Sequence, residues 1–237
     1  MLSFKGQRML IVAPHPDDEV FGCGGLIHRC KREGGEVYVL FLTVGTTADF
    51  SKSGVSTMDE RMKEIESVAN ALKLDGYRMA LPGNEYHLQL DALPQKRLID
   101  EIERGKDISL QALTPQIVLT PLPNDYNQDH RAACLAMLTA TRPTPPTFRS
   151  QQRLVLQYEL PPSGWTAGFE ASPLNFYVGL EEEDIEAKVK ALELYPSQLK
   201  NPKGPLSVHG VRTLAALRGI HSGCDNAEAF YAKRVLV

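Results

Sequence analysis

The segment MLIVAPHPDDEVFGCGGLIHRCKREGGEVYVLFL, residues 9–42, decides the fold class. It opens with a continuously apolar run at residues 9–13, which is typical of a strand buried on both faces of a parallel sheet. A helical pattern follows at residues 20–32 and ends at a glycine pair, and a second buried-strand pattern occupies residues 37–42. Strand, helix and strand in this order favour an α/β fold.

The same alternation continues through the middle of the chain. A capping box at residues 56–60 predicts a second helix, and Pro94 opens a third. Further strands are expected at residues 77–81 and 116–120, and a helix at 129–141. Because repeated strand-helix units form right-handed crossovers, the pattern predicts a Rossmann-like three-layer α/β fold whose mostly parallel sheet is flanked by helices.

The C-terminal part follows a proline cluster at residues 143–146. Its patterns predict strands at residues 154–159 and 175–178 and helices at residues 181–195, 206–217 and 226–231. No repeat or low-complexity segment separates it from the rest. We therefore expect residues 1–237 to form a single domain in which residues 143–237 pack on the sheet edge and do not fold independently.

Composition excludes several classes of protein. A net charge of -3 provides no basic surface for nucleic acid. The cysteines form no CxxC pair, which favours reduced thiols over a disulfide framework; they are Cys23, Cys30, Cys134 and Cys224. We find no signal peptide and no run of about 18 uncharged apolar residues that would predict a transmembrane segment. These features predict a cytoplasmic protein.

Polar residues crowd the end of the first predicted strand, at residues 13–19. Ligands bind at the carboxyl ends of strands in open α/β sheets. His15 and Asp18 offer the nitrogen and oxygen ligands that zinc accepts, and Asp17 between them could face a metal-bound water. The structural alternative is an aspartate helix cap in a turn that prolines rigidify. A cap explains one aspartate but not the whole group.

A third zinc ligand is expected because catalytic zinc sites usually take three protein groups. His130 follows the predicted strand at residues 116–120 and so should lie at the same sheet edge as His15. Alone, His130 would be interpreted as a surface or capping histidine. Asp129 could orient a metal ligand through a hydrogen bond, and it could equally be the N-cap of the following helix.

These residues resemble the PIG-L/LmbE-like family of zinc-dependent N-acetylglucosaminyl deacetylases. The family signature Ala-His-Pro-Asp-Asp-Glu is matched by Ala13 and residues 15–19, with Pro14 inserted. The later elements of the family are matched by Asp129-His130, by Arg61 and Glu64 in Arg-x-x-Glu, and by residues 195–198 and 218–230. The resemblance therefore extends across nearly the whole chain.

The resemblance implies a reaction and a set of roles. His15, Asp18 and His130 would bind zinc, or another divalent metal, and Asp17 would be the general base that activates water. Arg61 would contact the substrate, a small-molecule N-acetylated sugar or sugar conjugate. The enzyme would be an N-deacetylase, a hydrolase of carbon-nitrogen bonds in linear amides. Whether it forms a homo-oligomer is left open.

One position departs from the family. Members often carry a histidine three residues before the metal-binding histidine, and this chain has Asn127 there. Its amide could donate a hydrogen bond to the oxyanion in catalysis, but it cannot supply a proton. This departure favours one alternative, a weakly active or non-catalytic carbohydrate-binding protein. A hydrolase of another amide or ester is the second alternative, because the three metal ligands fix the type of reaction more firmly than the substrate.

Other residues have weaker functional interpretations. Arg61 opposes the helix dipole, which favours ligand binding over a solvated face paired with Glu64. The glycines after residue 21 match no phosphate-binding motif and favour close helix-to-sheet packing. Residues 46–54 could form a lid, with Trp165 and Phe169 as a sugar-stacking face. His209 and His221 are more simply ordinary histidines than residues of the site.

Overall fold

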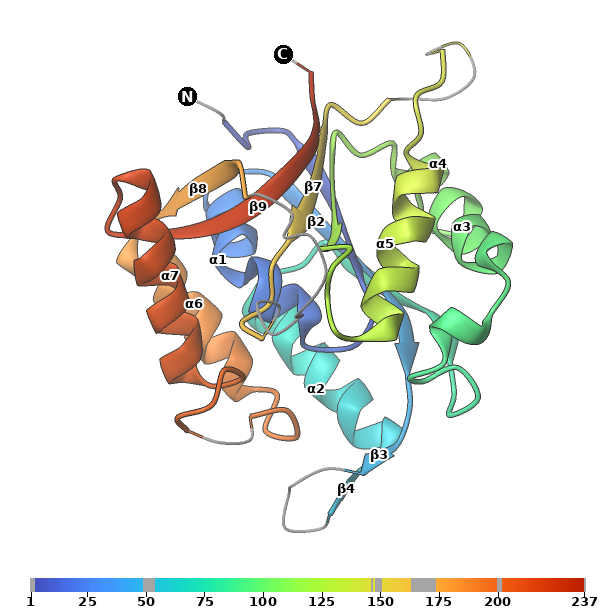
Figure 1. Ribbon diagram of the computed structural model, residues 1–237, viewed down its shortest axis with the longest axis horizontal. Helices are drawn as coiled ribbons and strands as arrows, with labels where there is room; N and C mark the ends of the chain where they lie inside the picture. The colour runs from blue at the N-terminus through green and yellow to red at the C-terminus, as the bar shows by residue number, and fades with distance from the viewer. Residues whose placement is uncertain are drawn as a thin grey trace.

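A seven-stranded sheet forms the centre of the molecule (Figure 1). The computed structural model describes residues 3–48, 54–145, 147, 151–162, 174–199 and 202–236. The strand order is β5-β2-β1-β6-β7-β9-β8. The strands are β1 (Arg8–Ala13), β2 (Glu36–Val44), β5 (Gly76–Pro82), β6 (Ile117–Pro121), β7 (Leu154–Tyr158), β8 (Phe176–Leu180) and β9 (Asn226–Val235). Two short strands, β3 (Thr47–Ala48) and β4 (Val55–Ser56), pair separately.

The order of the parallel strands creates a topological switch point beside β1. Strands β5, β2, β1, β6 and β7 are parallel, whereas β9 runs antiparallel to both β7 and β8. The chain goes from β1 to β2 on one side and later returns to β6 on the other side. Loops leaving β1 and β6 therefore diverge at the sheet edge, which is where ligands bind in doubly wound folds.

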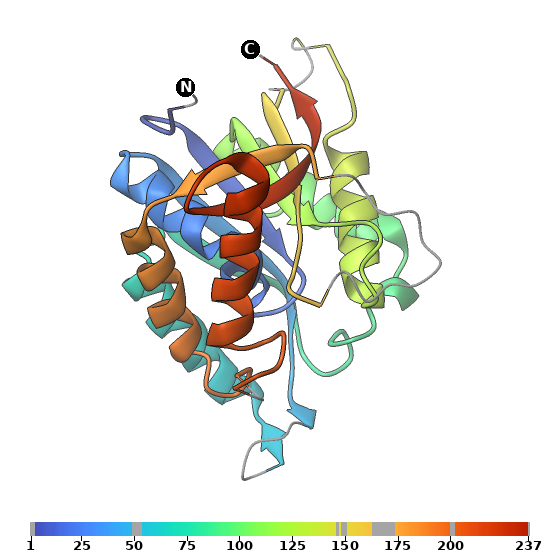
Figure 2. The same cartoon turned by 60° about the vertical axis from the view of Figure 1, so that its left-hand side comes forward.

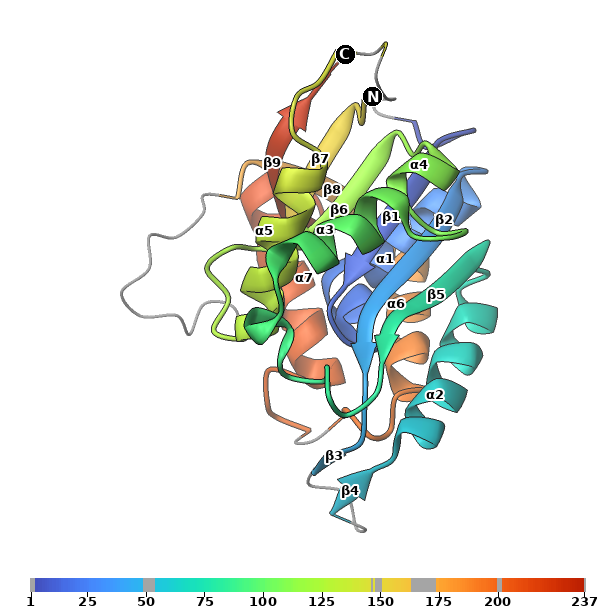
Figure 3. The ribbon, with the colours of Figure 1, turned by 90° about the vertical axis from the view of Figure 1, so that its right-hand side faces the viewer.

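Helices cover both faces of the sheet, as Figures 1 and 3 show. One face carries α1 (Asp18–Arg32), α2 (Met58–Ala71), α6 (Glu182–Glu193) and α7 (Val208–Ser222). The other carries α3 (Gln95–Arg104), α4 (Leu110–Leu113) and α5 (Gln128–Ala140), with the short 3-10 helix η1 (Leu90–Ala92) beside α5. Figure 2 brings α6 and α7 to the front of their layer. The predicted three-layer α/β fold is confirmed.

The central strand explains why the apolar runs predict this sheet. Along β1, Leu10 and Val12 pack into the core on the α5 side, whereas Met9, Ile11 and Ala13 pack into the core on the α1 side. All five side chains are fully buried. A strand between two helical layers has no polar face, and its sequence is therefore continuously apolar.

Glycines in α1 allow that helix to approach its neighbours closely. A Cβ at Gly22 would lie 2.3 Å from the Tyr158 ring, and a Cβ at Gly25 would lie 2.4 Å from the Leu180 side chain. These separations are too short for carbon atoms. The close-packing interpretation of this glycine cluster is therefore confirmed.

The C-terminal prediction was wrong at residues 226–231, which belong to strand β9 and not to a helix. Ala227, Glu228 and Ala229 favour helices locally, but pairing with β7 and β8 overrides that preference.

The predicted capping box is confirmed at Thr57 and Glu60. Among the helices described, none combines the length and apolar character needed to cross a membrane.

Candidate metal centre

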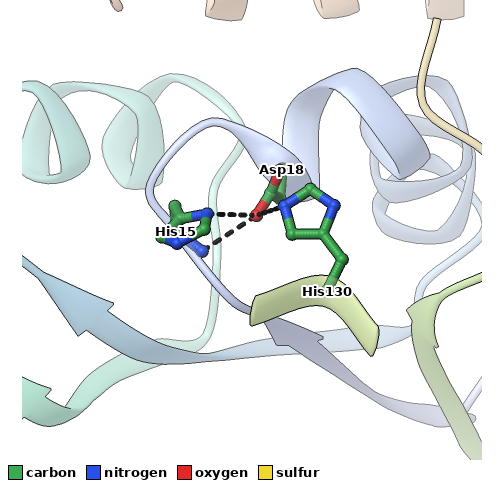
Figure 4. A group of neighbouring side chains, drawn as sticks. All are labelled: His15, Asp18 and His130. Carbon is green, nitrogen blue, oxygen red and sulfur yellow. Dashed lines mark hydrogen bonds and ion pairs between the residues drawn. The ribbon is translucent and has the colours of Figure 1, made fainter. Parts of the chain in front are cut away.

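Two loops at the switch point bring His15, Asp18 and His130 together (Figure 4). The first loop leaves β1 after Ala13 and enters α1 at Asp18; the second leaves β6 and enters α5 at Gln128. Because β1 and β6 are parallel neighbours, both loops lie at the same edge of the sheet. The structure thus joins the three residues that the sequence predicted as metal ligands.

The distances within this group suit a metal ion. The Oδ2 atom of Asp18 lies 3.4 Å from Nδ1 of His15 and 3.3 Å from Nε2 of His130. Two ligand atoms at about 2.1 Å from a tetrahedral zinc ion lie about 3.4 Å apart. All three ligand atoms fall within 4.8 Å of one another. The Nε2 atom of His130 is buried and makes no hydrogen bond within the described part of the chain, as expected of a nitrogen that binds a metal.

Two further carboxylates contact the ring nitrogens of His15 and His130 that do not face Asp18. Oδ2 of Asp129 lies 2.9 Å from Nε2 of His15 and accepts its hydrogen bond, which leaves Nδ1 of His15 free to face Asp18. The other oxygen of Asp129 accepts the backbone N–H of Leu90. Asp125 lies 3.3 Å from Nδ1 of His130. Such partners fix the orientation and tautomer of metal-binding histidines.

Asp129→Asn is expected to weaken zinc binding about 10- to 100-fold, because the amide no longer accepts a charge-assisted hydrogen bond from His15. Competition between the purified protein and a zinc chelator measures this change. Asp91→Asn, at an exposed position on the neighbouring η1, is the matched control and should leave the affinity unchanged. Equal affinities for both variants would contradict the orienting role of Asp129.

The local charges fit a cation at this point. Burial opposes the charge on Asp18, but the adjacent His130 and His15 rings hold the pKa of its carboxyl well below its usual range. Burial also lowers the pKa of His130, yet Asp18 and Asp125 raise it to about 10. The carboxylates therefore attract positive charge strongly, whether it comes from protons or from a metal ion.

Asp17 lies beside the three ligands and lines the same cavity, which has a volume of about 180 Å³. Burial and the neighbouring Asp18 carboxylate raise the pKa of Asp17 to about 7. Its side chain does not cap α1, although the residue precedes that helix. The structural alternative of a helix cap therefore does not account for Asp17.

Arg61 is buried in the first turns of α2 and also lines the cavity. Its guanidinium donates to the carbonyl of Pro16 at 3.1 Å, and a second nitrogen lies 3.4 Å from Nε2 of His87. Glu64 instead accepts hydrogen bonds from the backbone and hydroxyl of Ser197. Arg61 therefore does not form the solvated pair with Glu64 that was the alternative.

Asn127 also lines the cavity and is the N-cap of α5. Its side-chain oxygen accepts the backbone N–H of Asp129 at 2.9 Å. The alternative that Asp129 is the N-cap was therefore wrong. The side-chain NH2 of Asn127 is the group that could donate to a substrate, and this role stays a prediction.

His87, which the sequence patterns did not single out, lines the cavity from the loop after β5. Its ring lies edge-on to His15, with the centroids 5.3 Å apart. Burial lowers the pKa of His87 to about 4. Asp125 was also missed; it is fully buried and accepts the backbone N–H of Asn127. Only the loop conformations bring these residues to the site.

The weaker candidates from the sequence differ in whether they line the cavity. Thr47, from the predicted lid at residues 46–54, lines the cavity, whereas residues 49–53, Trp165 and Phe169 lie outside the described residues. His209 and His221 are exposed on α7 and are not among the described residues that line the cavity. The thiols of Cys23, Cys30 and Cys134 are buried and free, whereas Cys224 is exposed.

Comparisons with known proteins show the family of the chain. The family model described as GlcNAc-PI de-N-acetylase (PIG-L) matches residues 10–141, more than half of the chain. A diacetylchitobiose deacetylase of Thermococcus kodakarensis is 28% identical over 229 residues, covering 94% of this chain and 81% of that protein. The range matched by the family model includes all three metal-ligand candidates.

Solved structures share the fold. The conserved protein TT1542 from Thermus thermophilus has a TM-score of 0.71 and 26% identity, covering 98% of this chain and 96% of its own. The N,N'-diacetylchitobiose deacetylase from Pyrococcus horikoshii has a TM-score of 0.69 and 21% identity, covering 95% and 83%. The chain belongs to the PIG-L family of de-N-acetylases.

Proposed function

We propose that this chain is a zinc-dependent hydrolase that removes the N-acetyl group from an amino sugar or sugar conjugate. Three lines of support converge on this reaction: the family, the relatives named for diacetylchitobiose deacetylation, and the chemistry of the site. The observation that carries it is the position of Asp18. One oxygen of its carboxylate lies 3.4 Å from a nitrogen of His15 and 3.3 Å from a nitrogen of His130, and the separate carboxylate of Asp17 lines the same cavity.

His15, Asp18 and His130 would hold the zinc ion through two nitrogens and one oxygen. Bound there, zinc supplies Lewis acidity, which lowers the pKa of a coordinated water to roughly 7 and polarises an acetamide carbonyl. Three protein ligands leave a coordination position for solvent or substrate, as catalytic zinc sites require. Asp129 and Asp125 keep the two imidazoles in the orientation that presents those nitrogens.

Asp17 would act as general base and then as general acid. Its carboxylate takes a proton from the attacking water and returns it to the amine that leaves. The pKa of about 7 suits proton transfer in both directions near neutral pH. Because Asp17 is not one of the three ligand candidates, base and metal ligand are separate residues. A nucleophilic serine or cysteine is not needed for this reaction.

The cavity offers groups that would position the sugar. Arg61 places a buried positive charge on the cavity wall, where it can bind a hydroxyl or a charged substituent. Asn127 would donate an N–H to the oxygen on which negative charge develops. Apolar groups of Phe21, Leu160 and Tyr126 line other parts of the wall. Binding sites for small molecules commonly combine apolar walls with few polar groups.

Release of free acetate from a panel of N-acetylated sugars tests this function. The zinc-loaded protein is incubated with mono- and disaccharides of N-acetylglucosamine, with an O-acetylated sugar and with a simple acetamide. The proposal predicts acetate and a free amine from the N-acetylated sugars. Release only from the ester or the simple amide would support the alternative hydrolase.

A non-catalytic carbohydrate-binding protein is the second candidate, and Asn127 favours it because the side-chain amide of asparagine supplies no proton. The panel of N-acetylated sugars distinguishes this candidate from the hydrolase. Measurable sugar binding with no acetate release from any compound would support it and contradict the hydrolase. An Asn127→His variant that gains activity would show that the missing imidazole is responsible.

A further inference from the structure

The backbone at Asp17 is strained. Its φ is 108° and its ψ is -29°, whereas the other described non-glycine residues with positive φ, Lys73, Leu88 and Thr114, have φ between 45° and 59°. Those three lie near the ordinary left-handed well at about +57°, and Asp17 lies far outside it. Such a conformation persists only where surrounding contacts impose it.

Glu19 supplies a side-chain contact to the backbone of Asp17 within this turn. One oxygen of its carboxylate accepts the backbone N–H of Asp17 at 3.0 Å, and the other accepts the phenolic O–H of Tyr195 at 2.7 Å. Glu19 and Tyr195 are both fully buried. Neither is among the described residues that line the cavity, so neither can touch a substrate there.

Tyr195 is itself fixed by its own segment. It follows α6, and its backbone N–H donates to Leu192 while its carbonyl accepts from Gln198 and Leu199. Ser197, two residues further on, is tied to Glu64 of α2 by two hydrogen bonds. The phenol therefore reaches Glu19 from a rigid support. Tyr195 and Ser197 lie beyond residues 10–141, the part matched by the family model.

We propose that Tyr195 and Glu19 are positioning residues for the general base, because together they impose the strained turn that directs the Asp17 carboxylate toward the metal centre. This inference rests on the proposed role of Asp17. Tyr195 and Glu19 act through the backbone of Asp17 and not on the substrate. The C-terminal part of the chain thus sets the geometry of a residue 178 positions before Tyr195.

Tyr195→Phe tests the proposal because it removes one hydroxyl and keeps the ring. Glu19 then loses the hydrogen bond from Tyr195 and can shift, which frees the Asp17 turn to relax. We expect kcat for acetate release to fall about 10- to 100-fold, as small misplacements of a catalytic group do, with KM and zinc content unchanged. In an Asp17→Asn background the same substitution should cause no further loss, because the base is already absent.

Tyr158→Phe is the matched control. Tyr158 is equally buried, and its hydroxyl donates to the carbonyl of Val12 at 3.2 Å. It should reduce stability without changing kcat. If Tyr195→Phe does not fold, Glu19→Gln replaces it; that amide keeps an oxygen for the Asp17 N–H, so kcat should fall less than in Glu19→Ala.

A crystal structure of Tyr195→Phe gives a readout that does not depend on activity. The proposal predicts that φ of Asp17 moves out of the region near 108° or that its carboxylate turns away from the metal ligands. An unchanged Asp17 conformation, or full activity in Tyr195→Phe while Asp17→Asn is inactive, would overturn the positioning role alone. Wild-type protein that releases no acetate would instead overturn the proposed function, and the Asp17 conformation would still decide the positioning role.

Discussion

Asp17→Asn is expected to lower kcat for acetate release by roughly 10²- to 10⁴-fold, the usual contribution of a general acid-base group. The amide has nearly the same shape as the carboxylate but cannot accept a proton from water. His15, Asp18 and His130 are unchanged in this variant, so the zinc content should equal that of the wild type. Turnover of the best substrate in the sugar panel and metal analysis of the same sample measure the two quantities together.

The matched control for this variant is Asp184→Asn. Asp184 is also buried, but its carboxylate lies on α6 and accepts hydrogen bonds from Arg32 and His28. Its loss should lower the free energy of unfolding and leave kcat and zinc content unchanged. Unchanged turnover in Asp17→Asn would remove this residue from the mechanism, and loss of zinc would show that it holds the metal.

The sequence predicted the layers of the fold because the controlling signal is local. Residues 9–13 and 117–119 are continuously apolar, and a parallel sheet between two helical layers is the arrangement that buries such strands on both faces. The same signal placed His15 and His130 at one edge of the sheet. The capping box at Thr57 was predicted for a similar reason, since its partner is only three residues away.

The sequence failed where contacts between distant residues decide the structure. Glu228 favours a helix by propensity, but in β9 its carboxylate accepts the backbone N–H groups of Gly25 and Leu26 and pairs with Lys188. These partners lie 40 to 203 positions away along the chain. Local patterns contain no information about them, and a strand of helix-forming residues is the result.

The same contrast between local signals and long-range contacts applies to the site. Ligand candidates were predictable because they follow strands that periodicity identifies. The support of the site was predictable only in part: the sequence suggested Asp129 as an orienting residue, but not that it contacts His15, 114 positions away, or that Tyr195 reaches Glu19 across 176 positions. His87 comes from an irregular loop whose path no pattern predicts. Residues that bind were therefore easier to find than residues that orient them.

The double variant His15→Ala with His130→Ala is expected to reduce bound metal from about one ion per chain to nearly none and to abolish acetate release. Asp18 alone would then face the ion with one carboxylate, and Asp129 and Asp125 would lose the imidazoles that they orient. Elemental analysis after dialysis measures the metal content directly. This readout is independent of whether the correct substrate has been found.

Thermal unfolding adds a second measurement of the same variant. A ligand at 100 times its Kd stabilises the folded state by about 2.7 kcal/mol, so added zinc should raise the Tm of the wild type and leave that of the double variant unchanged. His209→Ala with His221→Ala removes two exposed histidines from α7 and should behave as the wild type. Metal content that survived in the first double variant but fell in the second would place the ion at α7, and the interpretation of the β1 and β6 loops as a hydrolytic centre would have to be abandoned.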